Sequence, residues 1–574
     1  MPGPCTHILR LLLAVALPCA ASAFPATRAA SAPPVRGSHG MVVSAEANAS
    51  QAGIAVLQGG GNAVDAAVAV AFALAVSFPE AGNLGGGGFL LLRRSDGAAF
   101  ALDFRETAPG ALTPGMFLDE NGRAVPQRSV SGGLAVGVPG SVAGLWEAHS
   151  RWGSRPWASL LEPAIRMARQ GVRVSRREAE ELAGRAQDLS SDPGARLVFT
   201  RGGKALREGD LLVQKDLART LQRIARLGPR GFYEGPVAES IVRTVGRAGG
   251  VLTDEDLASY RPVVRAPLEG SYRGQRVLTF PPPSGGGVLL LQVLGMLESF
   301  DLRASGAGSS SSVHLVAEAE RRAFADRSRW LGDPAFVRVP VEGLLASDYV
   351  RSRAATIRPD RATPSDDVAP GSPAGAPERE ETTHYAVADA QGNVVGVTTT
   401  LNSSFGAALL AEGTGVLLNN EIDDFALAPG VPNQFGLTGS AANRVGAGKR
   451  PLSSMCPTIV LAPEAGARPI LVLGSPGGST IVSAVLEVLV NVLDHGMGLQ
   501  EAVDAPRFHH QWLPDRIDHE VRAFPEDVAR ALGARGHTLK ARPPIGYVPA
   551  IGVDSSGAWL GAADPRRGGL AVGY

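Results

Sequence analysis

The sequence changes character abruptly at Thr382. The preceding segment, residues 358–381, is rich in Pro, Gly and charged residues and nearly free of large apolar side chains, which indicates a mobile, exposed linker. Two strand-like runs follow between residues 382 and 400, separated by the turn sequence Ala-Gln-Gly-Asn. The spacing predicts a hairpin in which Thr382 lies opposite Thr400 or Leu401. In this register the first residue after the linker has the Thr400 hydroxyl as a cross-strand neighbour.

A threonine hydroxyl at this place acts as a nucleophile only if a base lies beside it. One such base is the residue's own α-amino group, which becomes free if the chain is cut between Glu381 and Thr382. The Thr382 hydroxyl could drive that cut by attacking the Glu381 carbonyl carbon, in an N-to-O acyl shift followed by hydrolysis. From the pattern alone, the alternative that Thr382 merely begins a strand stays open.

Residues 1–23 have the order of a secretory signal peptide. A charged start is followed by an apolar run over residues 11–17 and by Ala-Ser-Ala before the expected cut. An uncleaved anchor is the alternative. Cleavage after Ala23 leaves Cys456 as the one cysteine of the mature chain, so no intramolecular disulfide is expected, and Cys456 is interpreted as a small buried residue. We predict a periplasmic or secreted protein.

Charge and hydropathy argue against several classes of partner. The 55 basic side chains balance 55 acidic ones, which removes the usual electrostatic basis for binding nucleic acid. A small-molecule substrate is the better expectation, in a chain long enough for two lobes or one large domain with insertions. The apolar run over residues 63–78 is too short and, with Asp65, too polar to span a membrane. We predict a buried helix there, with Asn62 as its N-cap.

A glycine run at residues 82–88 does not indicate a cofactor site. It lies between a predicted helix and a predicted strand, whereas a dinucleotide fingerprint needs strand, glycines and helix in that order. We therefore expect a tight turn and no cofactor. Residues 152–346 are predicted to form a largely helical scaffold. No metal site is predicted, because three candidate histidines lack a convincing ligand set: His384, His509 and His510.

Seven motifs, taken in order, make the chain resemble one known family. They are Gly-Gly-Asn-Ala-Val-Asp-Ala-Ala from position 60, Ala-Phe-Ala-Asp-Arg from 323, Thr-Thr-His-Tyr from 382, Leu-Asn-Ser-Ser-Phe-Gly from 401, Leu-Leu-Asn-Asn-Glu-Ile-Asp-Asp-Phe from 417, Lys-Arg-Pro-Leu-Ser-Ser-Met from 449 and Gly-Ser-Pro-Gly-Gly from 474. The sequence is similar to the γ-glutamyltranspeptidases over nearly its whole mature length. The resemblance implies an α+β fold, the four-layer αββα sandwich of N-terminal-nucleophile hydrolases. It also implies a precursor that splits into a large subunit, residues 24–381, and a small catalytic subunit, residues 382–574, which stay together as a heterodimer.

The same resemblance implies roles for individual residues. Thr382 is the expected nucleophile, oriented by Thr400; it forms a γ-glutamyl ester that passes to water or to an amino acid or peptide. The expected donor is glutathione or a related γ-glutamyl compound. Such a head group needs acidic residues and a cation at opposite ends of one pocket. The implied ammonium ligands are Asn402, Glu421 and Asp424, the carboxylate ligands are Arg105, Ser453 and Ser454, and the oxyanion is held by the amides of Gly477 and Gly478.

Two alternatives remain at the level of sequence. Some relatives are acylases for cephalosporin or glutaryl side chains that lack the ammonium, and Asp424 argues against this interpretation because it would face no cation. The other alternative is a periplasmic amino-acid-binding protein, which has no use for Thr382 after a linker. The chain departs from the family at Phe435, where many relatives have a lid tyrosine that contacts the residue equivalent to Asn402. We expect a lid that is latched without that hydrogen bond.

Overall fold

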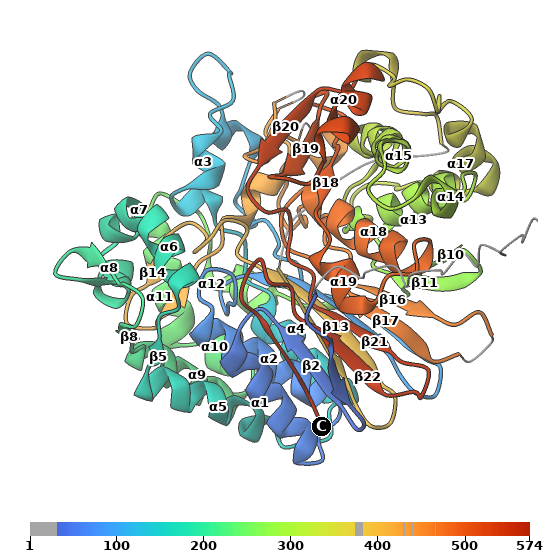
Figure 1. Ribbon diagram of the computed structural model, residues 1–574. Coiled ribbons are helices and arrows are strands. Elements are labelled where there is room, and N and C mark those ends of the chain that lie inside the picture. The colour runs from blue at the N-terminus through green and yellow to red at the C-terminus, as the bar shows by residue number, and fades with distance from the viewer. Residues whose placement is uncertain (1–30, 374–382, 429–430, 438–439, 465–466) are drawn as a thin grey trace, which may run out of the picture.

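The computed structural model describes residues 31–373, 383–428, 431–437, 440–464 and 467–574 (Figure 1). The predicted signal peptide, Glu381 and Thr382 lie outside these residues. Two seven-stranded sheets, antiparallel throughout, form the centre of the molecule. In spatial order the first sheet is β23 (Leu570–Gly573), β2 (Met41–Ser44), β12 (Thr383–Ala388), β13 (Val394–Thr400), β3 (Gly87–Arg93), β4 (Ala99–Asp103) and β9 (Val263–Arg265). The second sheet is β1 (Val35–Gly37), β22 (Trp559–Ala562), β21 (Ala550–Val553), β17 (Pro469–Leu473), β16 (Thr458–Leu461), β11 (Gln275–Thr279) and β10 (Leu268–Tyr272).

The two sheets pack against each other because their strands are apolar on both faces. The faces that meet share one buried core, in which the ring of Phe89 stacks on that of Phe280 with centroids 4.3 Å apart. The opposite face of the first sheet packs against a helical group that includes α1 (Ala47–Gln58), α2 (Ala63–Ser77), α5 (Trp157–Gln170) and α9 (Lys215–Leu227). The opposite face of the second sheet packs against α13 (Gly286–Leu297), α15 (Ser310–Trp330) and α18 (Thr480–Leu493). Helices and antiparallel sheets together confirm the predicted α+β class.

The predicted buried helix is α2, and every one of its residues is buried. Asn62 accepts hydrogen bonds from the first-turn amides while Asp65 accepts one from the Asn62 amide, which completes a capping box. Within the residues that the structure describes, no helix is long and apolar enough to cross a membrane.

The predicted hairpin is formed by β12 and β13. Its described pairs run from Thr383 opposite Thr399 to Ala388 opposite Val394, which is the expected register to within one residue. Thr382 itself lies outside the described residues, so its predicted pairing with Thr400 or Leu401 stays a prediction. On the far side of β13 lies the glycine run, where a Cβ added to Gly86 would come within 1.9 Å of the Thr400 carbonyl oxygen. The glycines therefore serve close backbone packing, as expected.

The stretch predicted to be helical contains helices but also sheet strands. Helices α5, α9, α11 (Pro236–Arg247) and α15 lie in it, as predicted. Strands β9, β10 and β11 also lie in this stretch, where no strand was predicted. Each is at most five residues long and partly exposed, so its apolar pattern is too short to reveal a strand.

The described part of the expected linker, residues 358–373, is anchored on α15. Thr363 donates a hydrogen bond of 2.7 Å to Glu318, and Ser365 accepts one from Arg321. Both Thr363 and Ser365 are buried. This part is therefore not the freely exposed segment that its composition indicates, because a few polar side chains fix a chain that lacks apolar ones.

Candidate active site

The predicted site residues gather at one edge of the two sheets. Arg105 lies two residues after the end of β4, and Thr400 ends β13, two strands away in the same sheet. In the second sheet, Ser453 and Ser454 precede β16, and the Gly477 loop follows the neighbouring β17. Since β16 pairs antiparallel with β17, the loop before one and the loop after the other emerge on the same side.

An open cavity of about 690 Å³ lies at this edge, lined by Thr400, Asn402, Phe435 and Gly477 among others. The Thr400 hydroxyl accepts a hydrogen bond of 2.7 Å from the Asn402 amide. This bond holds Asn402 at a positive φ of 73°, which asparagine tolerates better than most residues. The side-chain amide of Asn402 donates to the Asn420 carbonyl, while its oxygen, Oδ1, has no hydrogen-bond partner among the described residues.

Arg105 lies fully buried in a cluster of carboxyl groups. Its guanidinium forms ion pairs with Glu421 and, at 2.5 Å, with Asp424, and Glu106 lies 3.7 Å away. The guanidinium also donates hydrogen bonds of 3.1 and 3.2 Å to the backbone carbonyls of Pro451 and Leu452. The sequence analysis placed the cation and the acids at opposite ends of a pocket. In the structure, Arg105 forms direct ion pairs with two of these acids, Glu421 and Asp424.

The cluster contains more acids than cations. Burial raises the pKa of Glu421 and of Asp424 well above their ordinary values, against the lowering effect of Arg105, and raises that of Glu106 to about 7. One oxygen of Glu421 and both oxygens of Glu106 accept no hydrogen bond from the described residues. Because buried acceptors without a donor are costly, the cluster favours a further donor or positive charge.

Ser453 and Ser454 are fully buried behind this cluster. The carbonyl of Ser453 accepts from the Gly285 amide at 2.6 Å, and its hydroxyl accepts from the Met455 amide. The Ser454 hydroxyl accepts from Arg327 at 3.4 Å. The two serines thus come from a segment fixed by backbone bonds, next to the carbonyls that hold Arg105.

Gly477 and Gly478 form the turn that leads into α18. Their φ values of 125° and 72° are both in the region that favours glycine. Neither backbone amide donates a hydrogen bond to any described residue. The start of a helix also carries a partial positive charge. Two free amides at such a place can stabilise an oxyanion.

Replacing Gly477 by Ala should lower kcat about 100-fold, the usual effect of losing one oxyanion donor. The new Cβ would lie 2.6 Å from the Thr480 hydroxyl, and the residue would have to leave its φ of 125°, which turns its amide away. Steady-state kinetics on a γ-glutamyl anilide measures the effect. Gly496→Ala is the matched control, since Gly496 also has a positive φ but its added Cβ would meet nothing. An equal loss in both variants would contradict the assignment.

The lid segment is fastened by polar contacts. The Ser403 hydroxyl donates to the side-chain oxygen of Gln434 at 2.9 Å, and Asn433 donates to Asp424 at 3.4 Å. The carbonyl of Phe435 accepts from Gln511, whose side-chain oxygen accepts from Ser479, the residue after Gly478. The predicted lid around Phe435 therefore contacts Asp424 of the acidic cluster and, through Gln511, the loop of Gly477 and Gly478, without a phenolic hydroxyl.

We expect Phe435→Tyr to raise the ratio of transfer to hydrolysis roughly threefold, because a latched lid excludes water better than a loose one. A tyrosine hydroxyl would supply a donor for the unpartnered Oδ1 of Asn402, which lines the same cavity. Product analysis with glycylglycine as acceptor measures the ratio, and Phe435→Leu, which adds no donor, is the control. An unchanged ratio in Phe435→Tyr would show that the lid does not depend on this bond.

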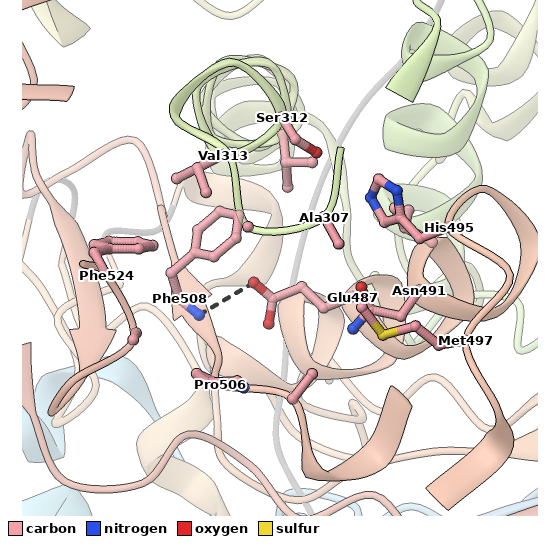
Figure 2. A pocket seen from close by; sticks show the side chains of 15 residues that line it. Ala307, Ser312, Val313, Glu487, Asn491, His495, Met497, Pro506, Phe508 and Phe524 are labelled. Atoms are coloured by element: carbon pink, nitrogen blue, oxygen red, sulfur yellow. Dashed lines mark hydrogen bonds between the residues drawn. The ribbon is translucent and has the colours of Figure 1, made fainter. Parts of the chain in front are cut away.

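A second, smaller pocket of about 180 Å³ lies between α15 and α18 (Figure 2). Its lining is largely apolar around Glu487, which accepts a hydrogen bond of 3.1 Å from the Phe508 amide. Burial raises the pKa of Glu487 well above its ordinary value. None of the predicted site residues lines this pocket, so it is separate from the candidate active site.

Some residues of the site were not singled out from the sequence. Glu106 stands beside Arg105 in the sequence, and its adjacency to that arginine was the available signal. Gln434 and Gln511 gave no signal, because uncharged amides are common on surfaces. Cys456 is fully buried in the core of the second sheet, as the sequence analysis interpreted it.

Comparison with known proteins agrees with this geometry. Residues 49–574 match the family described as gamma-glutamyltranspeptidase. The glutathione hydrolase proenzyme of Escherichia coli K12 is 46% identical over 543 residues, 94% of this chain and 93% of that protein. The acylase ACY 1 proenzyme of Pseudomonas sp. SE83 is 40% identical over 546 residues, 94% of each. The crystal structure of the cephalosporin acylase from Bacillus halodurans has a TM-score of 0.84 and 28% identity, and covers 98% of this chain and 99% of its own. The chain therefore belongs to the γ-glutamyltranspeptidase family.

Proposed function

We propose that this chain cuts itself before Thr382 and then hydrolyses or transfers the γ-glutamyl group of glutathione and related compounds. The observation that carries the proposal is the Arg105 cluster: one guanidinium faces three buried carboxyl groups, with unpartnered acceptor oxygens beside it. A γ-glutamyl head group brings both an ammonium and a carboxylate, so it supplies the missing cation and gives Arg105 a new anionic partner.

In the proposed complex the ammonium lies against Glu421, Asp424 and the free Oδ1 of Asn402. The carboxylate lies against Arg105, Ser453 and Ser454. Arg105 then binds the substrate carboxylate in place of part of its ion pairs with Glu421 and Asp424. The substrate ammonium takes the place of Arg105 as the positive partner of these carboxyl groups. This exchange keeps the buried charges balanced, which a substrate without an ammonium does not.

The proposed chemistry takes place at the cavity rim. The described β12–β13 register begins with Thr383 opposite Thr399, which supports the predicted pairing of Thr382 with Thr400. The Thr382 hydroxyl attacks the γ-carbonyl carbon and its proton passes through the α-amino group to the departing amine. The amides of Gly477 and Gly478 stabilise the oxyanion. Water or an acceptor amine then attacks the ester, takes the γ-glutamyl group and returns a proton to the Thr382 oxygen.

The proposal includes the architecture that the resemblance implies. Two facing sheets with helices on both outer faces support a four-layer αββα sandwich. A cut before Thr382 divides the chain into residues 24–381 and 382–574, and each part contributes strands to both sheets, which supports a heterodimer. Residues 1–23 would be removed on export to the periplasm or the medium, before the chain is cut at Thr382.

The test compares γ-glutamyl-4-nitroanilide with glutaryl-4-nitroanilide, which differs by the absence of the α-ammonium. We expect kcat/KM to favour the γ-glutamyl compound by about 100-fold or more, since a buried charge left unpaired costs several kcal/mol. Preference for the glutaryl compound would favour the acylase, the activity named for one relative. Binding of glutamate without turnover of either compound would favour the amino-acid-binding protein.

A further inference from the structure

The outer part of the active-site cavity is lined by charged side chains of both signs. On one wall lie Glu80 and Glu181, and both already accept hydrogen bonds from Arg177, at 3.2 and 3.0 Å. Ser404 donates a further hydrogen bond of 3.0 Å to Glu181. Each of these acids therefore has a cationic partner within the protein, although the second oxygen of Glu80 accepts no hydrogen bond from the described residues.

Three arginines line the same cavity, and they differ in their partners. Arg185 forms an ion pair with Asp188 at 2.9 Å, and Arg542 lies 3.8 Å from Asp518. Arg567 forms neither a direct ion pair nor a side-chain hydrogen bond with any described residue, although it lies in the field of Glu80. It is thus the one guanidinium of this lining, among the described residues, that forms no ion pair with a carboxylate.

The backbone that presents Arg567 is rigidly held. The preceding residue, Arg566, forms ion pairs with Glu520 at 2.6 Å and Asp564 at 3.2 Å, and donates to the carbonyls of Val503 and Ala505. Two consecutive arginines therefore have opposite surroundings: the first anchors the loop between β22 and β23, and the second is half-buried in the cavity wall. Burial and the nearby Arg177 lower the pKa of Arg567, an unfavourable situation that a bound anion would relieve.

We propose that Arg567 binds the carboxylate of the amine part of the substrate, that is, of the leaving group of the donor and of the incoming acceptor. The proposal rests on the function proposed above and narrows its substrate class. The preferred donors are γ-glutamyl peptides and γ-glutamyl amino acids with a free carboxylate beyond the scissile amide. The preferred acceptors are amino acids and short peptides rather than neutral amines.

The geometry of the cavity fits this role. Thr400 and Gly477, which border the reacting carbonyl in the proposed mechanism, line the same cavity as Arg567, while the glutamyl head group is directed into the Arg105 cluster behind it. The amine part must therefore point into the outer cavity. A guanidinium with uncommitted donors matches a carboxylate bidentately, so it recognises this class by charge and shape together.

The test uses two donors that differ by one carboxylate on the leaving group, γ-glutamyl-4-nitroanilide and γ-glutamyl-3-carboxy-4-nitroanilide. The readout is the ratio of kcat/KM for the carboxylated donor to that for the neutral one. We expect Arg567→Gln to lower this ratio about tenfold to hundredfold, mainly through KM, since a charge-assisted hydrogen bond is lost. Arg567→Lys should recover part of it. Arg542→Gln, which removes a neighbouring arginine of the same lining, should not change it.

A second arm measures the acceptor. With glycylglycine and glycylglycinamide as acceptors, Arg567→Gln should raise the apparent KM of glycylglycine alone. If Arg567 serves only to neutralise Glu80, both donors and both acceptors will change in parallel and the ratios will stay constant, which overturns the proposal. Wild-type enzyme that turns over neither donor would instead overturn the proposed function, so the two failures are distinguishable.

Discussion

Replacing Thr382 by Ala should leave the purified chain in one piece and lower turnover by about 10⁴-fold or more, as the loss of a nucleophile does in other hydrolases. The variant lacks the hydroxyl that attacks the Glu381 carbonyl, and without the cut no free α-amino group forms at position 382. Intact mass and N-terminal sequencing measure processing. Wild-type enzyme should give two chains, the smaller beginning at Thr382 and ending at Tyr574.

Thr383→Ala is the matched control, because it changes the next residue in the sequence, which is also a threonine. It should still be cut before residue 382 and keep activity. Either a processed Thr382→Ala protein or an uncut Thr383→Ala protein would mean that the nucleophile is misassigned. A single, uncut wild-type chain would refute self-processing altogether.

Arg105→Gln should lower kcat/KM about 1000-fold and also destabilise the fold by about 3–5 kcal/mol, the usual cost of removing one partner of a buried ion pair. The substrate carboxylate loses its cation, and the carboxyl groups of Glu106, Glu421 and Asp424 lose theirs. Steady-state kinetics with a γ-glutamyl anilide and denaturant unfolding measure the two effects separately.

A double variant separates recognition from stability. Adding Asp424→Asn to Arg105→Gln removes one of the carboxylates left unpaired, so stability should partly return while activity stays low. If activity returned together with stability, Arg105 would be structural only. Arg105→Lys keeps the charge but not the two-pronged geometry, and we expect intermediate values of both quantities.

Local features of the fold could be predicted from the sequence because each depends on near neighbours. The capping box of α2 lies within four residues, and the β12–β13 register follows from one short turn. The short strands β9 and β11 could not be predicted, since each pairs with a strand far away in the sequence, and the edge strand β10 pairs only with β11.

The candidate site shows the same difference between local features, which could be predicted, and long-range contacts, which could not. Motifs located Arg105, Glu421 and Asp424, but their direct contact joins residues more than 300 positions apart, so no local pattern reveals it. Arg567 could not be predicted as a site residue for a related reason. In the sequence it is one of two adjacent arginines, and only the distant partners of Arg566 show which of the two is uncommitted.

The order of strands in the first sheet couples unfolding of the processed protein to dissociation of its two chains. Strands β12, β13 and β23 lie after the proposed cut, whereas β2 and β3 lie before it, and each group pairs directly with the other. After the cut, the two chains can dissociate only if the sheet unfolds, and unfolding of the sheet allows them to dissociate. Denaturation of the mature enzyme is therefore a bimolecular equilibrium whose midpoint rises with protein concentration, whereas that of uncut Thr382→Ala does not depend on concentration.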